Sequence, residues 1–232
     1  MKEAEIMNIQ KLRLITLSPL NYYYTEAGSG MLPSNFIGDI ALKYALLHQL
    51  GLDNFFQPGK RNPTYQGDLV PYKFWFTVAM PPYFSIGKGE STPELMKPIK
   101  RNTMQGIDYN GTNVHPLVKT GSIMYKNFYF QQFIKPGNIF YSILISKEHL
   151  ELPQVLRLGT GKTGMVKIEI VEDLDVKPYI NLYTIKNILK KDEIYKRLSK
   201  RGFTYFEHFL LQYFVIGPVS LKDIEESYEG YV

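Results

Sequence analysis

Six residues in the second half of the chain, 159–164, hold three glycines, two threonines and Lys162. Glycine adopts backbone conformations that are closed to other residues, so this run predicts a loop at which the neighbouring elements end. An apolar turn opened by Pro153 precedes the loop. Residues 166–170, in which apolar and charged positions alternate, follow it as a predicted strand. Such a loop can bring backbone N–H groups and a lysine ammonium to a phosphate.

The loop differs from a nucleotide-binding P-loop, although Gly161, Lys162 and Thr163 match the end of that motif. The full motif has a glycine five residues before Gly161, where this chain has Leu156. A P-loop also leads from a strand into a helix, whereas this loop leads into a strand. We therefore reject the nucleoside triphosphate site.

Upstream, the hydrophobic pattern predicts a strand, a helix and a second strand. Residues 11–17 are nearly apolar on both faces, which is typical of a central strand. The helix is expected to begin at Ser34 or Asn35 as N-cap, with Asp39 in its first turn, and to end before Gly51. A loop over residues 53–71 leads to the second strand at 72–78. This order is the opening half of a ferredoxin-like βαββαβ unit.

The middle of the chain predicts an insertion and a hairpin. Residues 81–121 are poor in aliphatic side chains and rich in Pro, Gly, Thr and Asn, so this long segment is either functional or disordered. Residues 127–134 and 139–145 flank Lys135-Pro136-Gly137-Asn138 and predict a β-hairpin. Residues 149–158 are expected to form a short helical turn that leads to the glycine loop.

The C-terminal quarter is lysine-rich. Residues 185–201 predict one amphipathic helix, and the apolar residues 206–216 predict a strand or a buried helix. The acidic end, with Asp223 and three glutamates, is expected to be a loose tail. The whole chain is expected to form one domain over residues 1–232, with 81–121 as an inserted arm and 176–232 as a C-terminal extension.

Composition limits the classes of function. The net charge of +5 and the pI near 9.1 favour a polyanionic partner. The absence of cysteine excludes disulfides and cysteine-based metal sites, and the four histidines lack metal-ligand spacing. We expect no cofactor. The N-terminus lacks the apolar core of a signal peptide and no apolar run approaches the length of a membrane span, so we expect a soluble, cytoplasmic protein.

Two blocks of sequence resemble a known family. The first is the glycine loop with the residues before it, from Leu152-Pro153 through Arg157-Leu158-Gly159 to Lys162 and the following strand. The second is Tyr22-Tyr23-Tyr24-Thr25-Glu26 with residues 36–46 of the predicted helix. In this order and spacing they resemble the type I-D Cas-five (Csc-one) family of CRISPR-associated RAMP proteins, which are RNA-binding relatives of the RRM. The resemblance spans most of residues 9–171.

The resemblance implies an α+β, RRM-type (RAMP) fold with an antiparallel sheet, and a subunit of the Cascade complex in antiviral defence. Such a subunit would hold the 5′ handle of the CRISPR RNA, contact the large subunit and the backbone subunits, meet target DNA through the complex, and have no membrane partner. Single-stranded RNA binding uses backbone N–H groups and cations for phosphates and aromatic rings for bases. The expected RNA-binding residues are Gly159, Gly161, Lys162, Thr163 and Gly164, with Arg157 as a supporting cation and Tyr22, Tyr23 and Tyr24 for stacking.

Two other interpretations stay open. The chain could be a metal-independent endoribonuclease that processes repeat RNA, with His48, a tyrosine of 22–24 and Lys162 as its candidate catalytic set. It could also be a purely structural protein, in which the glycine loop is an ordinary turn and the tyrosines pack in the core. We expect a non-catalytic protein with no catalytic residues and no metal site.

Overall fold

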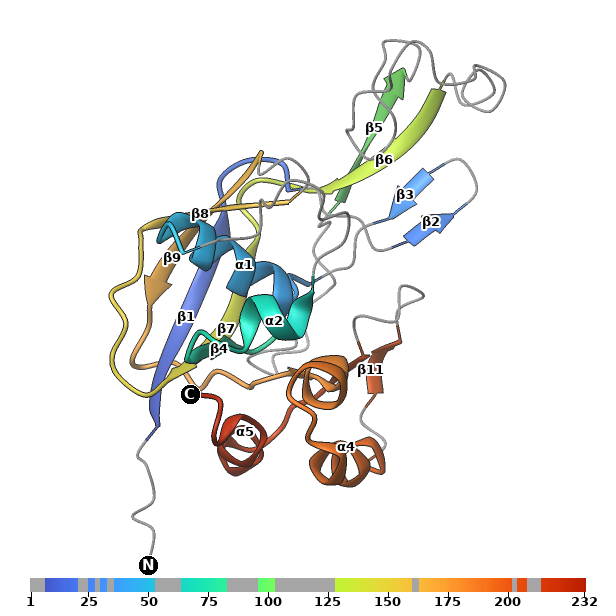
Figure 1. Cartoon of the computed structure of the whole chain (residues 1–232). Helices are drawn as coiled ribbons and strands as arrows, with labels where there is room; N and C mark the ends of the chain where they lie inside the picture. The colour runs from blue at the N-terminus through green and yellow to red at the C-terminus, as the bar shows by residue number, and fades with distance from the viewer. Residues whose placement is uncertain are drawn as a thin grey trace, which may run out of the picture.

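A computed structural model provides the structure of the chain (Figure 1). It describes residues 7–20, 25–27, 30–32, 36–52, 64–82, 96–102, 128–159, 163–201, 204–207 and 214–232.

The centre of the molecule is a five-stranded antiparallel sheet. Its strands follow the order β4-β7-β1-β9-β8. Their bounds are β1 (Asn8–Thr16), β4 (Phe74–Phe76), β7 (Ile139–Ser146), β8 (Val155–Leu158) and β9 (Gly164–Ile170).

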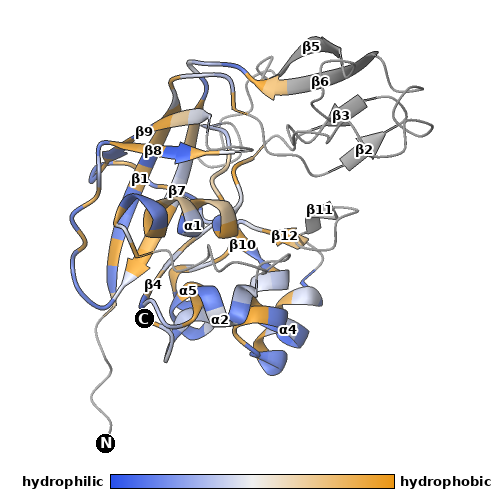
Figure 2. Ribbon diagram, turned by 45° about the horizontal axis from the view of Figure 1, so that its top comes forward, coloured by the Kyte–Doolittle hydropathy of each residue, from blue (hydrophilic) through white to orange (hydrophobic). Residues whose placement is uncertain are grey.

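Strand β1 occupies the middle of this sheet, which confirms the central position predicted for residues 11–17. The expectation of two apolar faces is wrong. Leu12 and Leu14 are fully buried, whereas Lys11, Arg13 and Ile15 between them are only half-buried. Hydrophobic and hydrophilic residues are accordingly mixed along the strands of the sheet (Figure 2). One face of the sheet is therefore the core face and the other is partly open.

Helix α1 (Asp39–Gln49) contacts β4 and β8. Its N-cap is Gly38, so the predicted caps Ser34 and Asn35 are wrong. Phe36 and Ile37 precede the helix, and Ile37 instead forms a β-bridge with Ala79. The predicted end is confirmed, because Gly51 just after the helix has φ +67°. A second short helix, α2 (Tyr65–Leu69), lies where a loop was expected.

The connection between β7 and β9 differs from the expected βαββαβ unit. That unit requires a helix before its last strand, but in the described residues 147–159 the chain forms strand β8 and no helix. The helical turn predicted for 149–158 is therefore wrong. Buried Leu156 and Leu158 alternate with half-buried Val155 and exposed Arg157, which is the period of a strand at the surface of a core.

The predicted hairpin is also wrong in its pairing. The two strands exist as β6 (Phe128–Ile134) and β7, but they belong to different sheets. The end of β1 fills the turn between them: Gly137 N donates to Thr16 O at 2.6 Å, and Thr16 Oγ1 donates to Lys135 O at 2.6 Å. These contacts replace the hydrogen bonds that would have closed the hairpin.

Strand β6 belongs to a second, four-stranded sheet with the order β2-β3-β6-β5. The other strands are β2 (Thr25–Ala27), β3 (Gly30–Leu32) and β5 (Met96–Asn102). Strand β5 lies inside the predicted insertion 81–121, most of which falls outside the described residues. In Figure 1, β5 and β6 extend away from the five-stranded sheet.

The C-terminal part is a small sheet with short helices. Strands β10 (Ile180–Asn181), β12 (Phe214–Ile216) and β11 (Thr204–Glu207) lie in that order. They are accompanied by the π-helix η4 (Thr184–Ile188) and by α4 (Asp192–Ser199) and α5 (Leu221–Tyr228).

Two predictions for this part are wrong. The single helix expected over 185–201 is interrupted at Lys190, which has φ +56°. The acidic end is not a loose tail, because α5 buries Ile224 and Tyr228. The strand predicted within 206–216 is confirmed in part by β11 and β12. In the parts of the chain described here, no helix is long and apolar enough to cross a membrane.

Candidate functional site

The glycine loop connects β8 and β9. Leu158 pairs with Gly164, so the intervening five residues, 159–163, form the loop of a hairpin. Gly159 has φ +85°, a conformation that residues with a Cβ rarely adopt, which explains a glycine at this position. Thr163 is exposed, whereas Thr160, Gly161 and Lys162 lie outside the described residues.

Gly164 is required by packing. It is buried at the start of β9, and a Cβ built on it would lie 2.6 Å from Leu20 Cδ1 and 3.0 Å from Leu158 O. Both distances are shorter than ordinary van der Waals contacts. The chain at Leu20 therefore lies directly against the end of the glycine loop.

Ser18 fixes the C-terminal side of the loop. The backbone N–H of Met165 donates to Ser18 Oγ at 2.8 Å, and Ser18 Oγ donates to Thr163 O at 3.4 Å. Leu17 N also donates to Met165 O at 2.8 Å. Reasoning from the sequence missed Ser18, because its contact with Thr163 spans 145 residues and leaves no local signal.

The tyrosines 22–24 lie outside the described residues, but their attachment point is described. Leu20 exchanges two backbone hydrogen bonds of 3.0 Å with Ile134 and contacts Gly164. Leu20, the last described residue before the tyrosines, therefore lies beside the end of the glycine loop.

Arg157 is exposed on β8, where it pairs with Met165 of β9. It points to the same side of the sheet as Met165, away from buried Leu156 and Leu158. The structure thus places a cation on the open face, two residues before Gly159.

His48 is half-buried in the last turn of α1. Its proposed partners, Lys162 and the tyrosines 22–24, fall outside the described residues, so this catalytic set stays a prediction. Within the described ranges, no three His, Cys, Asp or Glu side chains are grouped as metal ligands.

Asp39 and Lys43 on α1 have strongly shifted pKa values, which often mark functional sites. Burial raises the pKa of Asp39 to about 6, although hydrogen bonds from Thr184 and Asn181 act in the opposite direction. Burial also lowers the pKa of Lys43 well below its ordinary value. The two residues are 1% and 0% exposed, so no substrate can reach them. They belong to the core.

Comparison with known families places the chain among the CRISPR-associated proteins. The model of the family described as type I-D CRISPR-associated protein Cas5/Csc1 matches residues 7–201, and the chain belongs to this family. This confirms the resemblance carried by the tyrosine block and the glycine loop. No curated protein shows significant sequence similarity to the chain.

Several solved structures are distantly similar. A chain of the apo type III-B Cmr-beta complex shares 12% identity at a TM-score of 0.41, covering 71% of this chain and 98% of its own. A chain of a type IV-B CRISPR complex shares 8% identity at a TM-score of 0.40, and the match covers 72% of this chain and 91% of that one. Crystalline Cmr4 shares 13% identity at a TM-score of 0.35, with 71% of this chain and 99% of that one covered. Such scores indicate only a remote likeness.

Proposed function

We propose that this chain is a non-catalytic RNA-binding subunit of a type I-D CRISPR effector complex of the Cascade type. It holds the 5′ handle of the CRISPR RNA and joins the large subunit to the backbone subunits. Its sheet is a variant of the ferredoxin-like unit: β9, β1, β7 and β4 keep the strand directions, and β8 replaces the second helix.

The contact between Leu20 and the position of Gly164 carries this proposal. Two segments that are about 140 residues apart meet there. One leads into the tyrosines 22–24 and the other ends the glycine loop. A cradle for phosphates and a source of aromatic rings are thereby attached at the same end of the central strands, which is the combination that single-stranded RNA requires.

Each segment has its own part in binding. Gly159 and Gly161 keep side chains away from the phosphates, so that backbone N–H groups and Thr163 can approach them. Gly164, the third glycine expected at the phosphates, is buried and closes the loop against Leu20. Lys162 adds a mobile positive charge, and Arg157 supports it from β8. The tyrosines 22–24 stack on bases that are turned out of the strand.

The non-catalytic role is our expectation. Cleavage of RNA without metal needs a base at the 2′-OH and a group at the leaving oxygen, both within hydrogen-bond reach. His48, the candidate base, lies in the last turn of α1, and its candidate partners Lys162 and the tyrosines 22–24 lie outside the described residues.

Incubation of the purified protein with labelled repeat RNA, with and without divalent metal, tests the proposal. We expect a complex with intact RNA. Specific cleavage that disappears in His48→Ala would establish the endoribonuclease instead. Absence of both binding and cleavage, in the isolated protein and after co-expression with its complex, would leave a structural protein.

A further inference from the structure

The side of the five-stranded sheet that faces away from the core carries an ordered set of side chains, which we call the outward face. The strand registers arrange them in rows across β1, β9 and β8. Leu17, Met165 and Arg157 form the first row, next to the glycine loop. The second row is Ile15, Lys167 and Val155, and the third is Arg13 and Glu169. Lys11 follows on β1.

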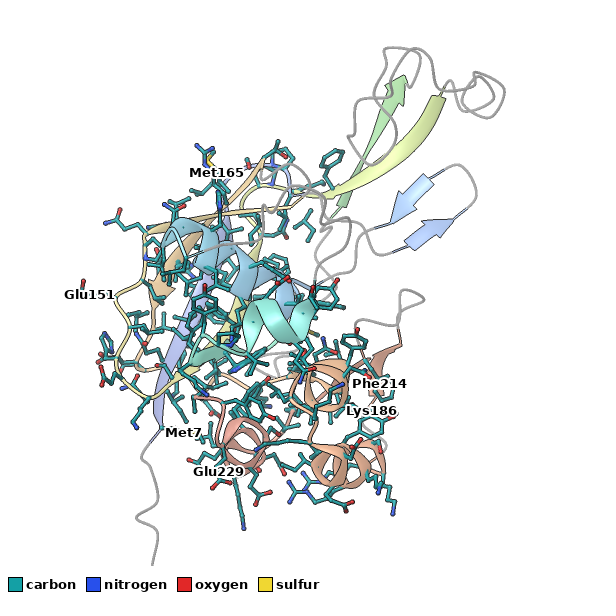
Figure 3. The ribbon with its side chains drawn as sticks, viewed as in Figure 1. Met7, Glu151, Met165, Lys186, Phe214 and Glu229 are labelled. Atoms are coloured by element: carbon teal, nitrogen blue, oxygen red, sulfur yellow. The ribbon has the colours of Figure 1, made fainter. Side chains whose placement is uncertain are left out.

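The outward face is exposed to solvent on β1, β9 and β8, and its side chains are buried on β7. Ile143 and Ile145 of β7 are fully buried, and Tyr141 is 8% exposed. In contrast, Leu17 is 46% and Met165 38% exposed, Arg157 and Lys167 are exposed, and Lys11, Arg13 and Ile15 are half-buried. The open part thus begins at the glycine loop and crosses three strands. Figure 3 shows Met165 at the end of the molecule where the glycine loop joins β9, and Lys186 and Glu229 towards the opposite end.

The charge on these rows is unbalanced. Four cations, Lys11, Arg13, Arg157 and Lys167, face one carboxylate, Glu169. Glu169 uses both oxygens, since Oε2 lies 3.2 Å from Arg13 Nη1 and Oε1 lies 2.7 Å from Lys167 Nζ. One carboxylate therefore holds two cations side by side on neighbouring strands and neutralises only one of them.

The cations lie along a diagonal across the strands. Arg157 of β8 is opposite Met165 of β9, and Lys167 follows Met165 by two residues on the same strand. Lys167 is in turn opposite Ile15 of β1, and Arg13 precedes Ile15 by two residues. Such diagonal neighbours are about 7–8 Å apart. Apolar side chains, including Ile15, Leu17 and Met165, lie between and beside the cations. A polyanion with apolar faces between its charges fits this pattern, and single-stranded nucleic acid has that chemistry.

We propose that the outward face binds the nucleotides that follow those held at the glycine loop, with phosphates at Lys167, Arg13 and Lys11 and bases against Ile15, Leu17 and Met165. The inference rests on the proposed function and extends it, because it gives the RNA strand a path across β9 and β1. An acidic protein segment would fit the cations, but it would not explain why they begin at the glycine loop and pass from β8 to β9 to β1 before they continue along β1.

Two fluorescein-labelled oligouridines test this path, one of about 4 and one of about 12 nucleotides, within the range of single-strand site sizes. The variant Lys11→Gln/Lys167→Gln should bind the short oligonucleotide like the wild type. For the long one its log–log salt slope should flatten by about 1.4, from two contacts of roughly 0.7 each. Glu169→Gln should steepen the log–log salt slope for the long oligonucleotide, because it releases Arg13 and Lys167 to bind phosphates.

The ion pair Glu193–Lys196 on α4, 3.0 Å long and exposed, provides matched controls. Glu193→Gln and Lys196→Gln should change neither slope. Equal slopes for the wild type and the double variant on the long oligonucleotide would overturn the path while leaving the glycine loop as a binding site. If the wild type binds neither oligonucleotide, the proposed function itself fails. Loss of an acidic protein subunit, and not of RNA, in the double variant would identify a protein interface and also overturn the path.

Discussion

Trp75 of β4 is stacked on Tyr228 of α5, with ring centroids 6.0 Å apart and planes inclined by 29°. Trp75 Nε1 also donates to the backbone oxygen of Tyr231 at 3.1 Å. Both aromatic side chains are almost completely buried. The last helix of the chain therefore completes the core at the edge of the sheet.

Tyr228 should be essential for stability through its ring and not through its hydroxyl. Tyr228→Ala removes a fully buried ring and should lower the free energy of unfolding by about 3–5 kcal/mol. The hydroxyl is buried and has no hydrogen-bond partner among the described residues. Tyr228→Phe should therefore keep or raise stability, by about 1 kcal/mol. Urea unfolding of both variants measures the difference, and a large loss in Tyr228→Phe would reveal a hydrogen bond at that oxygen.

Asp223 holds α5 in place. Burial alone would raise its pKa, but hydrogen bonds from Arg201 and Ser220 lower it below the usual value. Ser220 and Asp223 form a capping box at the start of the helix, and Arg197 adds a second ion pair. Asp223→Ala should cost about 2–4 kcal/mol. Exposed Glu225 on the same helix is the control, and equal melting temperatures for the two alanine variants would contradict this role.

The acidic end illustrates where prediction from the sequence stops. Ser220 and Asp223 have capping-box spacing, and Ile224 and Tyr228 are four residues apart, so a helix could have been predicted. Its docking could not, because Trp75 lies about 150 residues away. The break of the helix at Lys190 could not be predicted either, because the apolar pattern of 185–201 fits a continuous helix. In the structure a π-helix begins at Thr184, and the Thr184 hydroxyl donates to Asp39 far away in the sequence.

Asp39 should make stability depend on pH. The folded protein retains the Asp39 proton up to about pH 6, whereas an ordinary aspartate releases it near 3.8. The unfolded state thus binds fewer protons between these values, and the free energy of unfolding falls as pH rises through them. The fall should be about 3 kcal/mol, since each pKa unit corresponds to roughly 1.4 kcal/mol.

Asp39→Asn should remove this fall in the free energy of unfolding, because an amide does not titrate in this pH range. The variant should stay folded, since an asparagine side chain can still accept from Asn181 and donate to the Thr184 hydroxyl. Chemical denaturation between pH 4 and pH 7.5 compares the two proteins. Parallel curves would show that the carboxylate is not buried as a charged group.

Lys43 should be replaceable by an apolar residue. Its Nζ lies 3.3 Å from the centroid of the Trp75 ring and donates to Tyr72 O at 2.8 Å. A net favourable site for the cation would raise its pKa, but burial lowers it well below the ordinary value. Lys43→Met keeps the volume and should raise the free energy of unfolding by about 1 kcal/mol at pH 7. A loss of more than about 2 kcal/mol would show that the cation–π contact outweighs the cost of burial.

The candidate site was predictable in its parts but not in its assembly. The local composition indicated Gly159 to Gly164 and the tyrosines 22–24 as candidates, because glycine, lysine and aromatic residues are distinctive in any context, and their role in binding stays a prediction. The contacts of Leu20 with Gly164 and of Ser18 with Met165 depend on tertiary structure. Apart from Arg157, the cations of the outward face were also missed, since Arg13 and Lys167 share a face only through the register of β1 and β9.

The salt dependence of RNA binding by loop variants shows whether the glycine loop holds the phosphates of the CRISPR RNA. Lys162→Ala should flatten the log–log salt slope for handle RNA by about 0.7, the value for one lost phosphate contact on a single strand. Gly161→Val should weaken binding further, because a Cβ blocks the approach of the backbone. Lys186→Ala, at an exposed cation of η4, is the control and should bind like the wild type. If both loop variants remain folded and bind handle RNA with the affinity and slope of the wild type, the loop is only a turn and does not hold the RNA.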